Sequence, residues 1–474
     1  MKRQYLSILV LILLAGGCAS VPNDSGVDEI SQMMRDRSSQ TLEWKTGEWK
    51  TGVRMDDDPR VRAMLEQPLD ADRAVAVAVV NSPRLQMILA DLGMARSELI
   101  EASTIPNPML ELETRSGGSS FRPYEITLAQ SLLDLISLPR RRQLGTAMFE
   151  VAKLRVSSEI MRFAAEVRAG YFSLLAASQG LETSRTIMEA ARTSTDLAVR
   201  QHAAGNITDL DLENEQALYE QAKLDLARSE EQVLIGRERV IGALGLRDSS
   251  TNWSIQSEFP PPPAQEMTLT ELTTLAQTRR LDMAIARREV EIAERALPLS
   301  RRSAIGEIVG DVHLEREPDG ERTVGPGIEF PIPIFNRGRA ARMRTESQLL
   351  RSRQSLAMMT ARADSELRTA DKRLAAARAR IEYYRDVVLP RRARIVELTK
   401  LEQNAMLVGV YQLLQARQSE ANARREYIEA QRDYWVVRND LDAALNGTGS
   451  PELEMLMGSD ERRTGDSDSR RGGH

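Results

Sequence analysis

The sequence reads as two consecutive copies of one arrangement. Each half runs through a helix, a hairpin of two short strands, a long helix, a turn that contains glycine, and a long returning helix. Three matched positions align the copies with an offset that drifts only from 196 to 204 residues: Arg84-Leu85 with Arg280-Leu281, Glu166 with Glu366, and Gly205 with Gly409. Self-similarity that holds its register over so many residues predicts one supersecondary unit used twice.

The long helices set the scale of the fold. Residues 140–202 contain no proline, and apolar residues recur there at helical spacing. The matching stretch, 337–409, is interrupted once, at Pro390, where we expect a bend or a break. Both stretches far exceed the average helix of about 11 residues. Helices of this length with a narrow apolar stripe are expected to lie along other long helices, as in coiled coils.

Four short segments alternate apolar residues with acidic or polar ones, which is typical of strands. They are Pro108–Glu113, Tyr124–Leu128, Asp311–Glu315 and Gly327–Phe330. The pattern fits soluble β-ribbons that cap a helical bundle, and it also fits strands with lipid on one side and water on the other. Four strands cannot close a barrel, since the smallest have about eight, and lipid tolerates no open sheet edge. Lipid-facing strands would therefore require several chains.

The start of the chain indicates export. A basic Met1-Lys2-Arg3 precedes an apolar run from Leu6 to Leu14, which is too short to span a bilayer. Cys18, the only cysteine, follows small residues, as in a bacterial lipobox in which the thiol is acylated. The alternative is an ordinary secretory signal with an incidental cysteine. A single cysteine excludes disulfides within the chain.

Composition excludes several classes of function. The net charge is −5 over 474 residues with basic and acidic residues interspersed, which argues against a nucleic-acid partner. After the signal no segment has 18 continuous apolar residues, so no transmembrane helix is expected. We find no catalytic constellation, phosphate loop or zinc motif, so neither an enzyme nor a cofactor is predicted. The three histidines show no ligand spacing, and Met358-Met359 and Met406 are expected to fill gaps in packing rather than bind a metal.

Several motifs together resemble the TolC-like outer-membrane efflux proteins, here as a lipoprotein member. The resemblance covers about Asp72 to Leu445. The residues that support it are 82–85 together with 106–108, residues 327–335 before the second long helix, and the two turns at residues 204–212 and 404–416. It implies a mainly α fold with a small β part, in which tandem strand hairpins and long helical hairpins assemble as a homotrimer. The trimer would form a 12-stranded outer-membrane β-barrel and a 12-helix periplasmic α-barrel.

The resemblance also gives the turns a role. In the family, the two helix–turn–helix tips form the periplasmic end, close the tunnel at rest and dock a periplasmic adaptor. In the first turn, Gly205 would supply a left-handed residue and Thr208 or Asp209 would cap the returning helix. Asp209 is then either a helix N-terminal residue satisfied by the dipole or, with Asp211, an acid in the tunnel mouth that favours cations.

The second turn departs from many family members. Gly409 is expected to be left-handed, like Gly205. Gln412 and Gln415 stand where many members carry aspartate, so a tight acidic ring is not expected. A hydrogen-bonded or apolar constriction that involves Tyr411 and Leu413 is an equal alternative. By resemblance, the pattern is closest to members associated with heavy-metal or copper export.

We divide the chain into a signal peptide (1–17), an N-terminal segment along the helical barrel (18–72), repeat 1 (73–247), a linker (248–267), repeat 2 (268–447) and a disordered tail (448–474). The predicted function is a passive exit duct of a Gram-negative outer membrane. It would be lipid-anchored and opened by an adaptor and an inner-membrane pump, of the RND type by resemblance. Heavy-metal ions or small toxic compounds are the expected cargo. The alternative is a non-conducting periplasmic coiled-coil scaffold or adaptor lipoprotein.

Overall fold

The computed structural model describes residues 26–37, 59–114, 124–246, 253–302, 306–317, 319–335 and 337–449. The predicted signal peptide, Cys18, most of the N-terminal segment and nearly all of the predicted tail lie outside the described residues. The chain forms two compact units. Unit 1 comprises Met1–Ile30, Ile88–Val156 and Met283–Thr360, and unit 2 comprises Ser31–Met87, Ser157–Asp282 and Ala361–His474. Each unit therefore takes segments from both copies of the duplicated arrangement.

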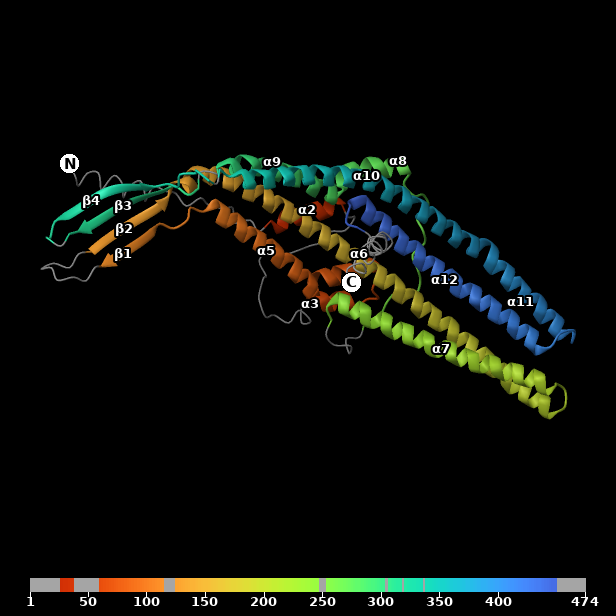
Figure 1. The fold of residues 1–474 in the computed structure, drawn as a ribbon. Helices are drawn as coiled ribbons and strands as arrows, with labels where there is room; N and C mark the ends of the chain where they lie inside the picture. Colours follow the sequence, from red (N-terminus) through yellow and green to blue (C-terminus); the bar gives the residue numbers. More distant parts are fainter. Residues whose placement is uncertain are drawn as a thin grey trace, which may run out of the picture. The chain divides into compact units, whose positions relative to one another are not determined.

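The first copy follows the predicted order of elements (Figure 1). After α2 (Val27–Arg37) and α3 (Pro59–Leu65), it contains α4 (Ala71–Asn81), α5 (Pro83–Ser103), β1 (Met109–Thr114), β2 (Tyr124–Ser131), α6 (Leu132–Ala203) and α7 (Asp209–Leu244). The 72-residue α6 confirms the predicted long helix but begins eight residues earlier. Pro139 lies inside its N-terminal part and does not end it.

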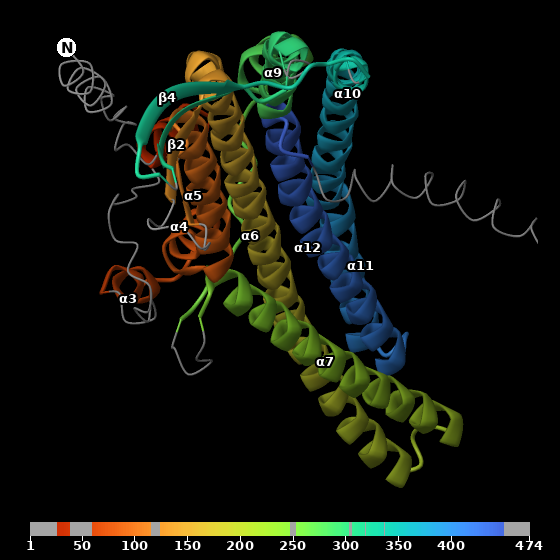
Figure 2. The same ribbon diagram turned by 60° about the vertical axis from the view of Figure 1, so that its left-hand side comes forward.

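The second copy repeats this order. It contains α8 (Leu269–Arg279), α9 (Leu281–Arg302), β3 (Val309–Arg316), β4 (Arg322–Glu329), α10 (Arg339–Tyr383), the π-helical turn η3 (Tyr384–Val388), α11 (Leu389–Asn404) and α12 (Val410–Asn446). Figure 2 shows α7 beside α6 and α12 beside α11, so that each copy ends in a helical hairpin of unit 2. The tandem duplication of strand hairpin and helical hairpin is confirmed.

The interruption predicted at Pro390 takes the form of a π-helical turn. Proline has no N–H to donate, so the hydrogen-bond ladder must change ahead of it. Here the backbone N–H of Leu389 donates to the carbonyl of Tyr384, five residues back, and Pro390 is the second residue of α11. The helix widens locally instead of breaking.

The four strands form one antiparallel sheet in unit 1, in the order β1-β2-β3-β4. The β2–β3 pairing, from Tyr124–Arg316 to Ser131–Val309, joins the hairpins of the two copies. β4 begins five residues earlier than predicted and includes Gly325, Pro326 and Gly327. These residues are compatible with an edge strand, because proline has no backbone N–H and no strand of this sheet pairs with the outer side of β4.

The core of unit 2 forms where the short helices meet the long ones. One hydrophobic cluster joins α8, α10 and α12 around the fully buried Tyr434. On α6, the buried Tyr171 donates its hydroxyl hydrogen to the carbonyl of Leu69 at 2.8 Å. The Phe172 ring stacks on Trp435 of α12 with 5.4 Å between centroids, which joins the two copies within this unit.

Equivalent arginines confirm the register of the duplication. Arg84, at the start of α5, pairs with Glu166 on α6, and Arg280, between α8 and α9, pairs with Glu366 on α10 at 2.8 Å. Their surroundings differ, because the Arg280 side chain is 2% exposed and that of Arg84 is 47% exposed. Arg280 has two further hydrogen-bond acceptors, the carboxylate of Asp282 and the carbonyl of Ala444, whereas the guanidinium of Arg84 lies over the Phe163 ring, 5.4 Å from its centroid.

Among the described residues no single helix is long and apolar enough to cross a membrane, although the bent pair α4–α5 passes that test by length and composition.

Candidate functional site

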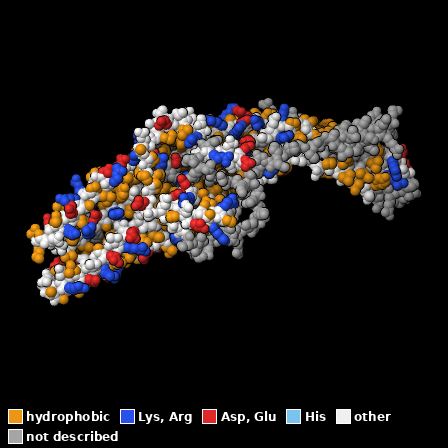
Figure 3. Space-filling model, turned by 180° about the vertical axis from the view of Figure 1, so that it is seen from behind, with side chains coloured by type: hydrophobic (Ala, Val, Ile, Leu, Met, Phe, Trp, Pro, Cys, Tyr) orange, Lys and Arg blue, Asp and Glu red, His pale blue; other side chains and the backbone are white. Residues whose placement is uncertain are grey.

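The sheet of unit 1 has one face that is apolar in every strand. Cross-strand pairing aligns two full rows on that face: Leu110, Leu128, Val312 and Pro326 in one, and Leu112, Ile126, Leu314 and Val324 in the next. Leu110, Leu112 and Val324 on the two outer strands are 61%, 65% and 63% exposed in the described part of the chain, and the residues of β2 and β3 between them are partly exposed. Figure 3 shows hydrophobic side chains gathered over the strands at the right of the view. Exposed apolar surface of this extent marks a contact with another molecule or with lipid.

The opposite face is polar and acidic. One row places Glu113, Glu125 and Glu315 on neighbouring strands, followed by Thr323 on β4. Like charges on directly paired positions destabilise a sheet unless water or cations surround them. The alternation was visible in the sequence, but this row was not, because strand pairing alone brings the three glutamates together.

The turn between α6 and α7 has the predicted local structure. Gly205 takes a left-handed φ of +73°, and its N–H donates to the carbonyl of His202 at 2.8 Å. Thr208 is the N-cap of α7 and forms a capping box with Asp211, whose carboxylate accepts from the Thr208 N–H and hydroxyl. These hydrogen bonds, that of the Thr208 hydroxyl foremost, lower the pKa of the Asp211 carboxyl. Asp209 lies 2.6 Å from Nε2 of His202.

The expectation for Gly409 is wrong. Its φ is −82°, in extended backbone, and it is the N-cap of α12. The left-handed residue of the second turn is Met406, with φ 59° and a side chain left 94% exposed by the turn. A non-glycine residue in this conformation carries a cost of about 1–2 kcal/mol. Each turn contains one glycine, but Gly205 is the left-handed residue of the first turn and Gly409 is the N-cap of α12 in the second. The two glycines are therefore not equivalent.

The two turns match at an offset of 201 residues. Met406 is equivalent to Gly205, Gly409 to Thr208 and Gln412 to Asp211. This value lies between the 200 of the Glu166–Glu366 match and the 202 of Gly245 and Gly447, the left-handed C-caps of α7 and α12. The second turn therefore lacks a capping box, because neither Gly409 nor Gln412 supplies the side-chain bonds of Thr208 and Asp211.

The remaining predicted tip residues lie on the first turns of α12. Tyr411 is half-buried, and Gln412 and Gln415 are exposed. The Gln412 side chain lies over Gly409, where an added Cβ would come within 3.1 Å of its Oε1. Both turns lie at the same end of unit 2 (Figures 1 and 2). Their role as a gate stays a prediction.

A buried carboxyl lies between the helices of the first hairpin and was not predicted. Glu215 on α7 is 3% exposed, and its Oε2 accepts a hydrogen bond from the Ser194 hydroxyl of α6 at 2.7 Å. Its Oε1 is buried with no partner in the described part of the chain. Burial raises the pKa of Glu215, against the opposing effect of Ser194. Thr195 donates to the Glu215 carbonyl at 3.0 Å, and Ser184 and Ser229 make a further hydrogen bond between these helices at 2.8 Å.

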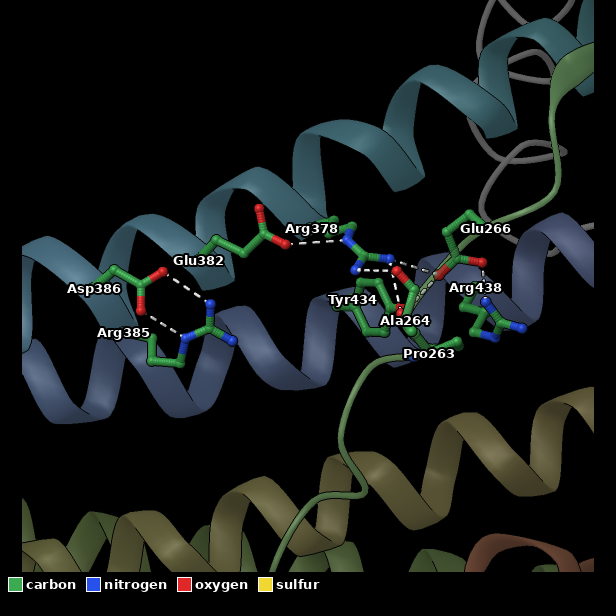
Figure 4. A network of polar contacts seen from close by, with 9 residues as sticks. All are labelled: Pro263, Ala264, Glu266, Arg378, Glu382, Arg385, Asp386, Tyr434 and Arg438. Carbon is green, nitrogen blue, oxygen red and sulfur yellow. Dashed lines mark hydrogen bonds and ion pairs between the residues drawn. The ribbon is translucent and has the colours of Figure 1, made fainter.

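The linker between the copies is bound to the second hairpin (Figure 4). Arg378 of α10 donates to the carbonyls of Pro263 and Ala264 at 3.0 and 3.3 Å. Glu266 accepts from the Tyr434 hydroxyl at 2.5 Å and pairs with Arg438. Burial, and then the bond to Glu266, raise the pKa of Tyr434 to about 12. The linker is thus a structural strap across α10 and α12, which its proline-rich sequence did not reveal.

No group of three or more His, Cys, Asp or Glu side chains in the described ranges could hold a metal ion. His313 on β3 lies 3.5 Å from the Asp311 carboxylate, without a third ligand-type neighbour in such a group.

Residues 75–246 match the family model described as outer membrane efflux protein. The chain is also 20% identical over 391 residues to the cobalt-zinc-cadmium resistance protein CzcC of Cupriavidus metallidurans, covering 80% of this chain and 90% of that protein. The resemblance to outer-membrane efflux proteins is confirmed.

Solved structures agree with the efflux-protein fold. The crystal structure of CusC matches with a TM-score of 0.63 and 17% identity over 85% of this chain and 95% of that one. The CmeC outer membrane channel of Campylobacter jejuni matches with a TM-score of 0.64 and 13% identity over 94% of this chain and 97% of that one. The long helical hairpins and the small antiparallel sheet therefore have the architecture of known channels.

Proposed function

We propose that this chain is the outer-membrane exit duct of a tripartite efflux system and that it acts as a homotrimer. The observation that carries the proposal is the two-faced sheet, which is apolar across all four strands on one side and acidic on the other. Four strands with edges at β1 and β4 cannot span lipid alone, because each unpaired backbone group would cost several kcal/mol. Three copies, as the family resemblance implies, would close a barrel of twelve strands.

The helical hairpins would continue this barrel as a tunnel through the periplasm. A periplasmic adaptor and an inner-membrane pump, of the RND type by resemblance, would engage and open the tips. Cys18 would anchor the chain by an acyl group. The duct performs no chemistry and depends on the pump for energy.

Cations are the cargo class that we favour. The glutamate row would face the lumen, where a ring of carboxylates favours cations. The name of the CzcC relative, a cobalt-zinc-cadmium resistance protein, agrees with heavy-metal ions. A passive tunnel needs no metal-binding site of its own, so transient passage is consistent with this cargo.

Conductance across a planar bilayer tests the duct. We expect discrete, cation-selective steps from the detergent-extracted protein. Replacing Glu113, Glu125 and Glu315 by Gln should lower the cation preference, and Glu397→Gln on exposed α11 is the control. Asp209→Asn and Asp211→Asn would show whether the tips also select. Failure to fractionate with the outer membrane would favour a periplasmic scaffold instead.

Crosslinking tests the assembly. Cysteines placed on β1 and on β4 should join neighbouring copies into a closed set of three, because these strands are the two sheet edges. Cys18 is the only native cysteine, so a Cys18→Ser background leaves no competing thiol. A ladder that ends at two copies, or that continues beyond three, would contradict the trimer.

A further inference from the structure

The sheet is followed at one end by a second exposed apolar zone. Ser131, Val309 and Glu329 pair in one row, so β2 and β4 end at the same side of the sheet. The residues that follow include six large side chains, which we call the apolar collar: Leu135 39%, Ile136 65%, Phe330 58%, Ile332 72%, Ile334 61% and Phe335 98% exposed. The collar continues the apolar surface of the strands past their ends in both copies.

Beyond the collar, both copies carry exposed arginines. The arginine girdle comprises Arg140 and Arg142 near the start of α6, and Arg337, Arg339, Arg342 and Arg344 at the start of α10. Among the described residues none of these six forms an ion pair, whereas their neighbour Arg141 is paired with Asp134 at 2.9 Å. The only acidic residue within 337–350 is Glu346. All belong to unit 1.

Such an excess of one charge needs an explanation. Many arginines on the described helices face a carboxylate, as Arg155 faces Glu289 and Arg353 faces Glu294. A solvated helix surface typically mixes both signs of charge. In the girdle, arginine is concentrated without acid, and it follows directly on an apolar zone. Apolar side chains with basic residues at the next level are the pattern of a membrane–water interface.

We propose that the girdle binds the phosphate groups of anionic phospholipids in the leaflet that borders the helical end of the sheet. This inference rests on the proposed membrane location of the strands. The collar would lie at the level of the glycerol backbone, and the guanidinium groups would reach the phosphates just outside it. Guanidinium suits this partner because its planar fork donates two parallel hydrogen bonds to phosphate oxygens. Lipid binding there would fix the depth of the sheet in the bilayer.

The test measures headgroup preference in the reconstituted full-length protein. Spin-labelled phosphatidylglycerol and phosphatidylcholine are compared for their association with protein in vesicles that contain both lipids. One basic residue near an anionic surface contributes roughly fivefold in partitioning, equivalent to about 1 kcal/mol. We expect wild type to prefer phosphatidylglycerol at low salt and R342Q/R344Q to lose several-fold of that preference. R342K/R344K should keep most of it.

The matched control is R391Q/R392Q, two exposed arginines on α11 that also lack ion pairs among the described residues. This pair should leave the preference unchanged. The proposed lipid binding by the girdle would be overturned if R342Q/R344Q kept the headgroup preference of wild type, or if R391Q/R392Q lost as much of that preference as R342Q/R344Q. Either result would leave the proposed exit duct unaffected. Protein that does not insert into either lipid would overturn both the girdle and the duct. Circular dichroism of each variant checks that these surface changes leave the helices folded.

Discussion

The equivalent ion pairs Arg280–Glu366 and Arg84–Glu166 allow the same arginine–glutamate interaction to be measured in a buried and in an exposed environment within one chain. Arg280 is 2% exposed and donates four hydrogen bonds: two to Asp282, one to Glu366 at 2.8 Å and one to the Ala444 carbonyl at 3.0 Å. Burial disfavours the charge, yet Asp282 and Glu366 outweigh that effect and raise the pKa of Arg280. Arg84 pairs with Glu166 while 47% exposed.

We predict very different costs for the same substitution. Arg280→Gln leaves the buried carboxylate of Glu366 and the partly buried one of Asp282 without their main counter-charge, which should cost about 3–5 kcal/mol. The lower end is favoured because Arg362 still donates to Glu366 at 2.5 Å. Arg84→Gln removes a largely solvated pair and should cost about 1 kcal/mol or less.

Guanidinium unfolding in detergent, followed by far-ultraviolet circular dichroism, measures both variants against wild type. The slope of the transition should be unchanged, so the midpoint shifts report stability directly. Proteolysis within α8 and α9 should be accelerated only in R280Q. Equal midpoint shifts for R280Q and R84Q would refute the argument from burial, as would a shift for R280Q no larger than that expected of a surface pair.

Three further outcomes are expected. Met406→Gly should stabilise the second hairpin by about 1 kcal/mol, because glycine adopts the left-handed conformation without steric strain. Gly205→Ala should destabilise the first hairpin by a similar amount, because it introduces that strain. Local hydrogen exchange at each turn measures both effects. Glu215 has a raised pKa, so the folded state binds the extra proton. Its stabilising effect is present below the unfolded pKa of about 4.3 and is lost as pH rises through the folded value, so Glu215→Gln should raise the unfolding midpoint at neutral pH and not at acidic pH. Tyr434→Phe should loosen the linker strap, seen as faster exchange of the amides at 263–266, and leave unit 1 exchange unaltered.

Periodicity in the sequence predicts most of the fold because the elements are long or strictly alternating. The helical stripe of α6 and the alternation of β2 are repeated often enough to outweigh single exceptions such as Pro139. The cap at Thr208 was predictable because a capping box is a local arrangement of neighbouring residues. Pro390 marked the change in α10 for a similar reason, although its form as a π-helical turn depends on the hydrogen bonds actually made.

Features that depend on tertiary pairing could not be predicted. Glycine serves equally as a left-handed residue and as an N-cap, and only the backbone angles distinguish the role of Gly409 from that of Gly205. The glutamate row around Glu125 follows from strand register, which four isolated segments do not define. Burial of Glu215 depends on the contact between α6 and α7. In the sequence Glu215 cannot be distinguished from the other glutamates of α7, which are expected on the helix surface.

The one-for-one match of the two turns has a practical consequence for protein engineering. From Gly205 to Asp211 and from Met406 to Gln412 the chain takes the same number of residues between equivalent backbone positions. The seven-residue segments can therefore be exchanged or duplicated without insertion or deletion. A chain that carries the first segment twice would present identical, capped ends on both hairpins, and a chain that carries the second segment twice would present two uncapped ends. Such chimeras would allow the contribution of each turn to partner selection to be assayed separately.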